Sequence, residues 1–435
     1  MTAPRITTRQ GLTALSPAIM FLLLYVAVSI IIGDFYVMPI TVALLAASAW
    51  GIMIDRKDTT LHQRIEYFSE SAGHSNILYM VWIFVMAGAF ASLAKGIGAI
   101  DATVELTLSL FPSHLILPAI FMASCFISLA IGTSVGTIVA IVPLVVELAA
   151  EGGGNIALFV ATALGGAFFG DNLSFISDTT IAATRTQGCG MSEKFRANLR
   201  IVLPAALITV TIYFFLGRDI DLTISERESN PWMVLPYLLV IISALCGLNV
   251  LLVLSLGIVS AMLLGMSCGN IAVIECCRFM GNGVNGMGEL IVITMLAAGM
   301  LGIVKKLGGI EFLLQRMTSR VTGKRGAQVS IAALVSLVNL CTANNTVAIL
   351  SVGSISKSIS SRYGISPRRT ASILDTCSCI VQSLIPYGAQ TLLATGLAKI
   401  SPAAPWPYLY YPWALAGAVA LAIILPSVKM KPTST

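Results

Sequence analysis

Charge is what this sequence has least of. Only 11% of its 435 residues are Asp, Glu, Lys or Arg, whereas 57% are hydrophobic, and the mean hydropathy is +0.89. Soluble globular proteins carry about 25% charged residues, and a soluble chain this apolar would have no way to cover its surface. Lipid is the solvent that suits the composition. The sequence therefore predicts an all-α, polytopic membrane protein.

Several functional signatures are also missing. The three histidines form no HExxH motif and the nine cysteines form no CxxC pair, so neither a zinc site nor a disulfide scaffold is indicated. The lack of a Walker A motif argues against ATP-driven pumping, and no nucleophile–base set indicates an enzyme. Gly281-x-Gly283-x-x-Gly286 has no βαβ context and is interpreted as a loop. The net charge of +6 is spread over short loops, so nucleic acid is not an expected partner.

What the sequence has instead is a series of apolar runs, each near the ~20 residues that cross a core of about 30 Å. The first run is not expected to be a signal peptide, because no small-residue cleavage site follows it and a second run begins at Val37. The clear runs are 15–32, 37–54, 77–94, 199–216, 232–246, 250–266, 290–304 and 408–426, and those broken by Gly, Pro or polar residues are 115–147, 155–184 and 328–394.

The pattern recurs at an offset near 210 residues. Ala87-Gly88 returns as Ala298-Gly299, Lys95 returns as Lys306, and Asn172 is matched with Gln382. The common offset predicts two related halves, residues 1–216 and 217–435.

Lysine and arginine predict the orientation. With the N-terminus in the cytoplasm, 21 of the 26 basic residues fall on the inside and 5 on the outside, as the positive-inside rule requires. Equivalent loops of the two halves then lie on opposite sides, with one Lys in 95–113 outside and six basic residues in 305–327 inside. We therefore expect two inverted-topology repeats with broken helices in the cell (inner) membrane, with both termini cytoplasmic.

An odd number of crossings in each half requires two segments, 115–146 and 328–356, to enter and leave on the same side. Re-entrant hairpins and pairs of short spans both satisfy this requirement.

The richest polar cluster within an apolar region is Gly-Gly-Ala-Phe-Phe-Gly-Asp-Asn-Leu-Ser-Phe-Ile-Ser-Asp-Thr-Thr at 165–180. A carboxylate at bilayer depth costs about 2.5–3.5 kcal/mol on insertion scales and marks an ion or proton path. Glycines let the helix unwind, and oxygen is the ligand that a hard cation such as Na⁺ prefers. On a continuous helix the two aspartates would share one face, and a solvated loop is the alternative. The expected ion- and proton-binding residues are Asp171, Asn172, Ser174, Ser177, Asp178, Thr179, Thr180 and Asp375, with Asp171 and Asp178 as Na⁺ ligands.

Polar residues also lie at the centres of the two segments that turn back. In the second half, Pro386 interrupts a helix at a place that corresponds to the first cluster, and such pairs of interruptions point to a substrate site. Interhelical hydrogen bonding is the alternative role. The expected residues for a small organic anion are Thr133, Ser134, Thr137, Asn344, Asn345, Thr346, Ser378 and Gln382.

The string Gly170-Asp171-x-x-Ser174-x-x-Ser177-Asp178-Thr179-Thr180 resembles the NhaC family of Na⁺/H⁺ antiporters, inverted-repeat carriers of the ion transporter superfamily. The likeness covers nearly the whole chain in length and layout. Family members commonly have Lys and Pro where this chain has Asn172 and Phe175.

The resemblance implies Na⁺/H⁺ exchange with no cofactor beyond these coupling ions. Because the family also includes malate/lactate exchangers and amino-acid carriers, a Na⁺- or H⁺-coupled carrier of a small carboxylate or amino acid is the alternative. The expected partners are the lipid bilayer with Na⁺, H⁺ or a small organic anion, and the sequence leaves a homodimer open. We expect Asp178, which has Ser177, Thr179 and Thr180 around it, to carry more of the binding than Asp171.

The predicted topology can be checked by cysteine labelling from outside sealed cells. Engineered cysteines near Glu226 and Asn282 should react, whereas those near Lys324 and Arg368 should not. Labelling at position 324 from outside would contradict the inverted arrangement.

Overall fold

The computed structural model describes residues 6–32, 39–54, 59–100, 102, 103, 106, 112–151, 154–174, 177–218, 220, 230–246, 248–268, 271–318 and 323–424. These residues form helices and connecting turns without a β-strand among them, so the predicted all-α class is confirmed. Val37, Phe175 and Glu226, which entered the sequence argument, lie outside the described residues.

The helices fall into two sets, one before and one after residue 217. The first set comprises α1 (Thr8–Ile32), α2 (Ile40–Met53), α3 (Leu61–Ala72), α4 (Ser75–Gly96), the 3₁₀ helix η1 (Ser113–Leu115), α6 (Ile116–Ile131), α7 (Ser134–Glu151), α8 (Ile156–Leu173), α9 (Asp178–Gln187) and α10 (Met191–Gly217). The second set comprises η2 (Pro231–Val234), α11 (Leu235–Leu245), α12 (Val250–Ser267), α13 (Val273–Gly286), α14 (Gly288–Lys306), α15 (Gly309–Thr318), α16 (Gly323–Thr342), α17 (Asn345–Arg362), α18 (Pro367–Leu384), α19 (Ala389–Ala398), η3 (Trp406–Tyr408) and α20 (Tyr410–Ile424).

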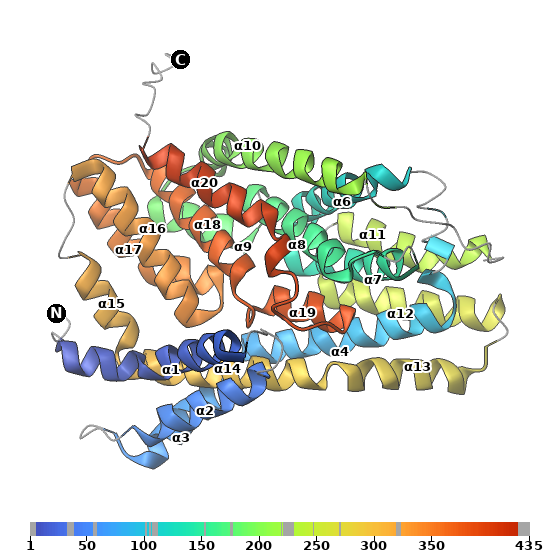
Figure 1. The fold of residues 1–435 in the computed structure, drawn as a ribbon, viewed down its shortest axis with the longest axis horizontal. Coiled ribbons are helices and arrows are strands. Elements are labelled where there is room, and N and C mark those ends of the chain that lie inside the picture. The colour runs from blue at the N-terminus through green and yellow to red at the C-terminus, as the bar shows by residue number, and fades with distance from the viewer. Residues whose placement is uncertain are drawn as a thin grey trace.

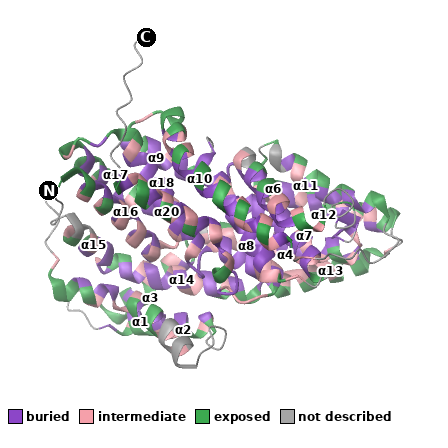
Figure 2. Cartoon of the chain, turned by 45° about the horizontal axis from the view of Figure 1, so that its top comes forward, coloured by how far each residue is buried: buried purple, intermediate pink, exposed green. Residues whose placement is uncertain are grey.

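Length and apolarity identify the helical stretches that can cross a bilayer. Six stretches of the described residues qualify, and several shorter apolar helices accompany them. Figure 2 shows exposed residues along the outer faces of the helices. Many exposed residues are large and apolar; Phe126, for example, is 73% exposed. Lipid covers such surfaces where water would not. The chain is thus a multi-pass membrane protein. The six stretches are Ile77–Gly96, Ile156–Gln187, Met191–Gly217, Val250–Ser267, Val273–Lys306 and Gly323–Thr342.

The two segments that the sequence predicted to turn back each form a helical hairpin. Gly132-Thr133 joins α6 to α7, and Ala343-Asn344 joins α16 to α17. Both turns use the left-handed region, with φ of +77° at Gly132 and +48° at Ala343, a conformation that bends the chain sharply after a helix. In Figure 1 one hairpin lies at the left and the other at the right, with α8, α9, α18 and α19 between them.

Helix boundaries recur along the chain at a constant spacing. α7, α8 and α9 begin 211 residues before α17, α18 and α19, respectively. Contacts recur in the same way, because α4 packs on α13 while α3 packs on α14, and α7 packs on α19 while α9 packs on α17. This spacing is what the predicted duplication requires. The opposite orientation of the two halves stays a prediction.

Glycines bring α4 and α13 into close contact. Gly281–Gly286, interpreted from the sequence as a loop, is the last part of α13, so that interpretation is wrong. A Cβ added at Gly283 would collide with the carbonyl oxygen of Gly88 in α4, whereas one added at Gly281 would meet no atom within 4 Å. Small residues allow this kind of backbone approach between membrane helices.

A pair of substitutions tests this contact. Gly283→Val should lower thermal stability, because overpacking of a close contact destabilises by about 1–3 kcal/mol. Gly281→Val, in the same helix, is the matched control. The measurement is the unfolding midpoint of the purified protein in detergent, and an equal decrease in both variants would show that the contact has no special role.

Candidate functional site

The central feature of the site is a break between α8 and α9. α8 ends at Leu173 and α9 begins at Asp178, while Ser174 and Ser177 between them have extended backbones, with ψ near 140°. Asp171 and Asp178 therefore do not share the face of one continuous helix. The solvated-loop alternative is also wrong, because Asp171, Ser174 and Ser177 are buried.

Asp171 is held by hydroxyl groups from two different segments. Ser177 donates to Oδ1 at 2.6 Å from the break, and Ser134 donates to Oδ2 at 3.0 Å from the first residue of α7. The carboxylate is only 6% exposed. The structure thus joins Asp171 and Ser177, predicted as ion-binding residues, with Ser134, predicted for an organic anion, in one cluster.

Asp178 lies in a different environment from Asp171. It is exposed and is the first residue of α9. The hydroxyls beside it do not gather on its carboxylate: Ser177 donates to Asp171 and lies 3.0 Å from the Thr179 hydroxyl, and Thr180 accepts a hydrogen bond from Lys194. The expectation that these oxygens surround Asp178 is therefore wrong in its geometry.

A cavity of about 120 Å³ lies between the two hairpin turns and the two helix breaks. The first residues of α7, α9, α17 and α19 all contribute to its walls, so four helix N-termini converge there. The structure brings nine of the sequence-predicted residues to this cavity. It is lined by Met80, Gly132, Thr133, Ser134, Val135, Asp171, Asp178, Thr179, Ala343, Asn344, Asn345, Thr346, Gln382, Ala389 and Gln390.

Two glutamines connect the hairpin turns through this cavity. Gln382 donates to the carbonyl oxygen of Ala343 at 3.1 Å and to Oε1 of Gln390 at 2.9 Å, and Gln390 donates to Ser134 at 3.3 Å. Asp171 is thereby linked to the second half of the chain. At the helix spacing of 211 residues, Gln382 is the equivalent of Asp171 rather than of Asn172. Gln390 was missed from the sequence, although the same spacing makes it the equivalent of Thr179.

Three predicted ion-binding residues lie in a second buried cluster, outside the cavity lining. Asp375 forms an ion pair with Lys194 of α10, and Lys194 also donates to the Asn172 carbonyl oxygen at 2.5 Å and to the Thr180 hydroxyl at 2.7 Å. Asn198 donates to the Asn172 side chain and to Asp375. Lys194 is one of the 21 basic residues that the orientation argument counted on the inside, as residues of short loops, but it lies in the first turn of α10 with 1% of its side chain exposed, so its placement in a loop is wrong. The spacing of four residues between Lys194 and Asn198, which places them on one helix face, could have indicated that both belong to this buried cluster.

The remaining predicted residues make local or interhelical contacts. Thr137 donates to the carbonyl oxygen of Thr133 and Ser378 donates to that of Asp375, each within one turn. The Ser378 carbonyl accepts a bond from Asn339 at 2.8 Å, which ties α16 to α18. Thr137, Ser174 and Ser378 lie outside the cavity lining.

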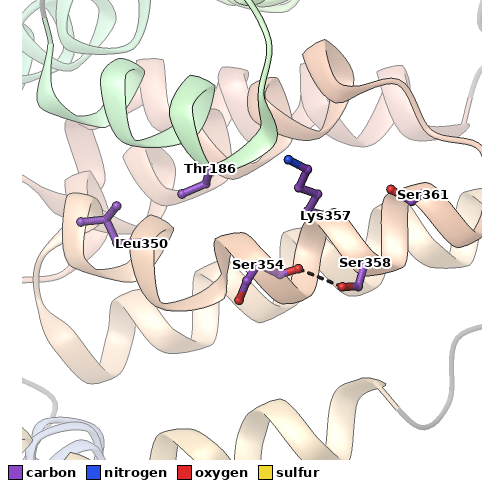
Figure 3. Close-up of a pocket in the computed structure, with 6 residues that line it drawn as sticks. All are labelled: Thr186, Leu350, Ser354, Lys357, Ser358 and Ser361. Carbon is purple, nitrogen blue, oxygen red and sulfur yellow. Dashed lines mark hydrogen bonds between the residues drawn. The ribbon is translucent and has the colours of Figure 1, made fainter.

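A larger, open pocket of about 480 Å³ lies farther along α9 and α17 (Figure 3). None of the described residues that line it carries a carboxylate. Gln187 donates to the carbonyl oxygen of Gly353 at 2.9 Å, and a Cβ at Gly353 would collide with Thr186, so α9 and α17 are tightly joined beside this pocket. The smaller cavity, which holds the buried carboxylate, is therefore the better candidate site. The open pocket is lined by Thr186, Leu350, Ser354, Lys357, Ser358 and Ser361.

Comparison with known proteins shows where similar chains occur. Residues 12–218 and 220–429 match the model of the Na⁺/H⁺ antiporter family. The Na⁺/H⁺ antiporter NhaC of Bacillus subtilis (strain 168) is 27% identical over 352 residues, which cover 73% of this chain and 76% of that protein. The malate-2H⁺/Na⁺-lactate antiporter of the same strain is 23% identical over 385 residues, 81% of each chain. Among solved structures, the YdaH transporter of Alcanivorax borkumensis aligns over 94% of this chain and 97% of its own, with 12% identity and a TM-score of only 0.41.

Proposed function

We propose that this chain, which belongs to the Na⁺/H⁺ antiporter family and is therefore a secondary active transporter, exchanges Na⁺ for H⁺ at Asp171. The family membership confirms the prediction made from the NhaC-like string. One observation carries the assignment to Asp171: its buried carboxylate lies in the wall of the central cavity, accepts two hydroxyl hydrogen bonds, and makes no ion pair within the part of the chain that the structure describes.

The hydroxyls of Ser134 and Ser177 can serve the site whether Asp171 binds Na⁺ or H⁺. A hydroxyl has one donor and two acceptor lone pairs. It donates to the carboxylate in the empty site and can turn its lone pairs toward Na⁺, a hard cation that prefers oxygen ligands. When Asp171 is protonated, its O–H can donate to one of the same oxygens. Na⁺ and H⁺ therefore need the same atoms and exclude each other.

The burial of Asp171 couples the two ions. An unpaired carboxylate at bilayer depth costs about 2.5–3.5 kcal/mol on insertion scales, whereas either Na⁺ or H⁺ neutralises it. The site is thus far more stable when loaded than when empty. Reorientation with a bound cation is favoured over reorientation without one, which is the condition for exchange rather than leak. This scheme requires no cofactor beyond the two coupling ions.

The inverted-repeat arrangement fits this scheme. The matched residues divide at 218–220, close to the predicted boundary of the halves, and helix boundaries recur every 211 residues. In Figure 1 the two hairpins lie on opposite sides of α8, α9, α18 and α19, and residues of both turns line the cavity, an arrangement that fits inverted halves. We also propose, from the positive-inside count, that both hairpins are re-entrant elements and that both termini lie in the cytoplasm of a cell whose inner membrane holds the protein.

A specific observation favours a second candidate, the transport of a small carboxylate. Helix N-termini carry partial positive charge and donate free N–H groups, so they attract anions, and four of them meet at the cavity. Asn345, which is 6% exposed, lines the cavity, and its side-chain N–H₂ donates to no oxygen or nitrogen atom of the described residues. In this candidate Thr133, Ser134 and Asn344 complete the anion site.

Isosteric substitution of the two aspartates tests the primary proposal. Asp171→Asn keeps the shape but removes the charge and the proton, so uptake of radioactive Na⁺ driven by a pH gradient should fall to the background of protein-free liposomes. Asp178→Asn is the matched control, and we expect it to retain exchange because Asp178 is exposed and lacks the hydroxyl partners of Asp171. Both variants are purified and assayed across a pH range. Full uptake with an unchanged pH profile in Asp171→Asn would remove that residue from the mechanism.

Proteoliposomes without organic solutes separate the two candidates. A Na⁺ gradient alone should produce an internal pH change if the cargo is Na⁺ and H⁺, and Asn345→Ala should leave the apparent KM for Na⁺ within about twofold. If the pH change appears only after a small monocarboxylate or dicarboxylate is added, and Asn345→Ala then raises the KM for that solute, the second candidate replaces the first.

A further inference from the structure

A buried ion pair that the exchange scheme does not use lies beside the helix break. Lys194 of α10 and Asp375 of α18 have side chains that are 1% and 0% exposed, and neither lines the cavity. Burying two charges is unfavourable unless their geometry and hydrogen bonds compensate for lost hydration. The pair also joins the two predicted halves of the chain.

All three donors of the Lys194 ammonium have partners. One bonds the Asn172 carbonyl oxygen at 2.5 Å, one bonds the Thr180 hydroxyl at 2.7 Å, and the third faces Asp375. An ammonium has no further donor. Lys194 is thus fully engaged in this cluster.

The two neutral partners of Lys194 lie on opposite sides of the break. Asn172 is in the last turn of α8, where carbonyl groups lack intrahelical partners and the helix dipole favours a cation. Thr180 is in the first turn of α9. One side chain therefore bridges the end of one helix and the start of the next. Asn198, one turn farther along α10, adds bonds to Asn172 and Asp375.

Ser177 lies within the segment that this bridge spans. Its hydroxyl reaches Asp171 at 2.6 Å only while the extended backbones of Ser174 and Ser177 keep their present form. Fixing both ends of a short segment restricts its conformations, and a displacement of about one ångström is enough to break a hydrogen bond of this length.

We propose that Lys194 is a positioning residue for the cation site. It bridges the two ends of the helix break so that the Ser177 hydroxyl stays on Asp171, and Asp375 neutralises its charge. The inference rests on the proposed exchange at Asp171, because it assigns Lys194 a role in Na⁺ affinity rather than in carrying an ion. Lys194 acts through Ser177 and does not contact the transported cation.

The test compares two threonine variants of α9. Thr180→Val removes one bond of the bridge and leaves both charges in place. Thr184→Val is the matched control, since Thr184 is equally buried and its hydroxyl bonds only backbone carbonyls of its own helix. We expect Thr180→Val to raise the apparent KM for Na⁺ by about tenfold with kcat within about twofold, and Thr184→Val to match the wild type.

A double variant removes the whole bridge without leaving a buried charge unpaired. Lys194→Met combined with Asp375→Asn should fold and should raise the KM for Na⁺ at least as much as Thr180→Val does. If Lys194 acts through Ser177, neither change should raise the KM further in a Ser177→Ala background, because residues that act through one another are not additive. A wild-type KM in the double variant, or full additivity with Ser177→Ala, would overturn the proposal.

Hydrogen–deuterium exchange separates this inference from the proposed function. Amides of the segment from Asn172 to Ile181 should exchange faster in Thr180→Val and in the double variant than in Thr184→Val, whatever ion is carried. If wild-type protein and Asp171→Asn transport Na⁺ alike, the proposed exchange at Asp171 fails. The amide comparison still tests whether Lys194 holds the two ends of the helix break together. Unchanged amide exchange in both bridge variants would refute the positioning role.

Discussion

A carboxylate enclosed by an apolar helix bundle is the constraint on which the rest of this site depends. Lipid and packed side chains offer an ionised Asp171 no solvation, so the protein must supply polar groups at the depth of the cavity. Two hydroxyls bond it directly, and two glutamines extend the contact to the opposite hairpin. The same lack of solvent makes a neutralising cation the favoured companion of the carboxylate.

Backbone architecture is what allows polar groups to reach this depth. Irregular backbone inside a membrane is tolerated only where it is buried in protein or lines a cavity, and here two helix breaks and two hairpin turns all meet that condition. The left-handed turn at Ala343, a residue without glycine's freedom, shows that the tight turn is kept even where its backbone is strained. The cavity is therefore the place where the helices end, and its polarity comes from their termini as much as from side chains.

Sequence was informative wherever periodicity or composition determines the outcome. Apolar runs located the membrane helices, and the motif at 170–180 located the break and Asp171. The sequence did not predict the direction in which each side chain of the motif points. Asp171 and Asn172 are adjacent, yet the Asp171 side chain lines the cavity and the Asn172 side chain bonds Asn198 of α10, because successive helical residues point about 100° apart and the partners come from distant segments.

Lysine posed a related problem for sequence analysis. Counting every Lys and Arg as a loop residue predicts orientation well, but it cannot distinguish Lys194, whose charge is paired inside the bundle, from lysines in water. The choice between re-entrant hairpins and pairs of short spans was also undecided, since a turn of only two residues is enough to join α6 to α7. Long-range pairing, rather than local preference, determined each of these features.

The correspondence of Asp171 with Gln382 has an evolutionary consequence. If the halves arose by duplication, as proposed, the ancestor was a single hairpin-and-broken-helix unit that paired with an identical copy and held the same residue twice. After fusion into one chain, the two copies could change independently. One half then kept an acid and the other an amide of similar reach, so that architecture remained shared while chemistry became specialised. Divergence between the halves should therefore be greatest at the few side chains that line the cavity and least at the glycines and turns that shape it.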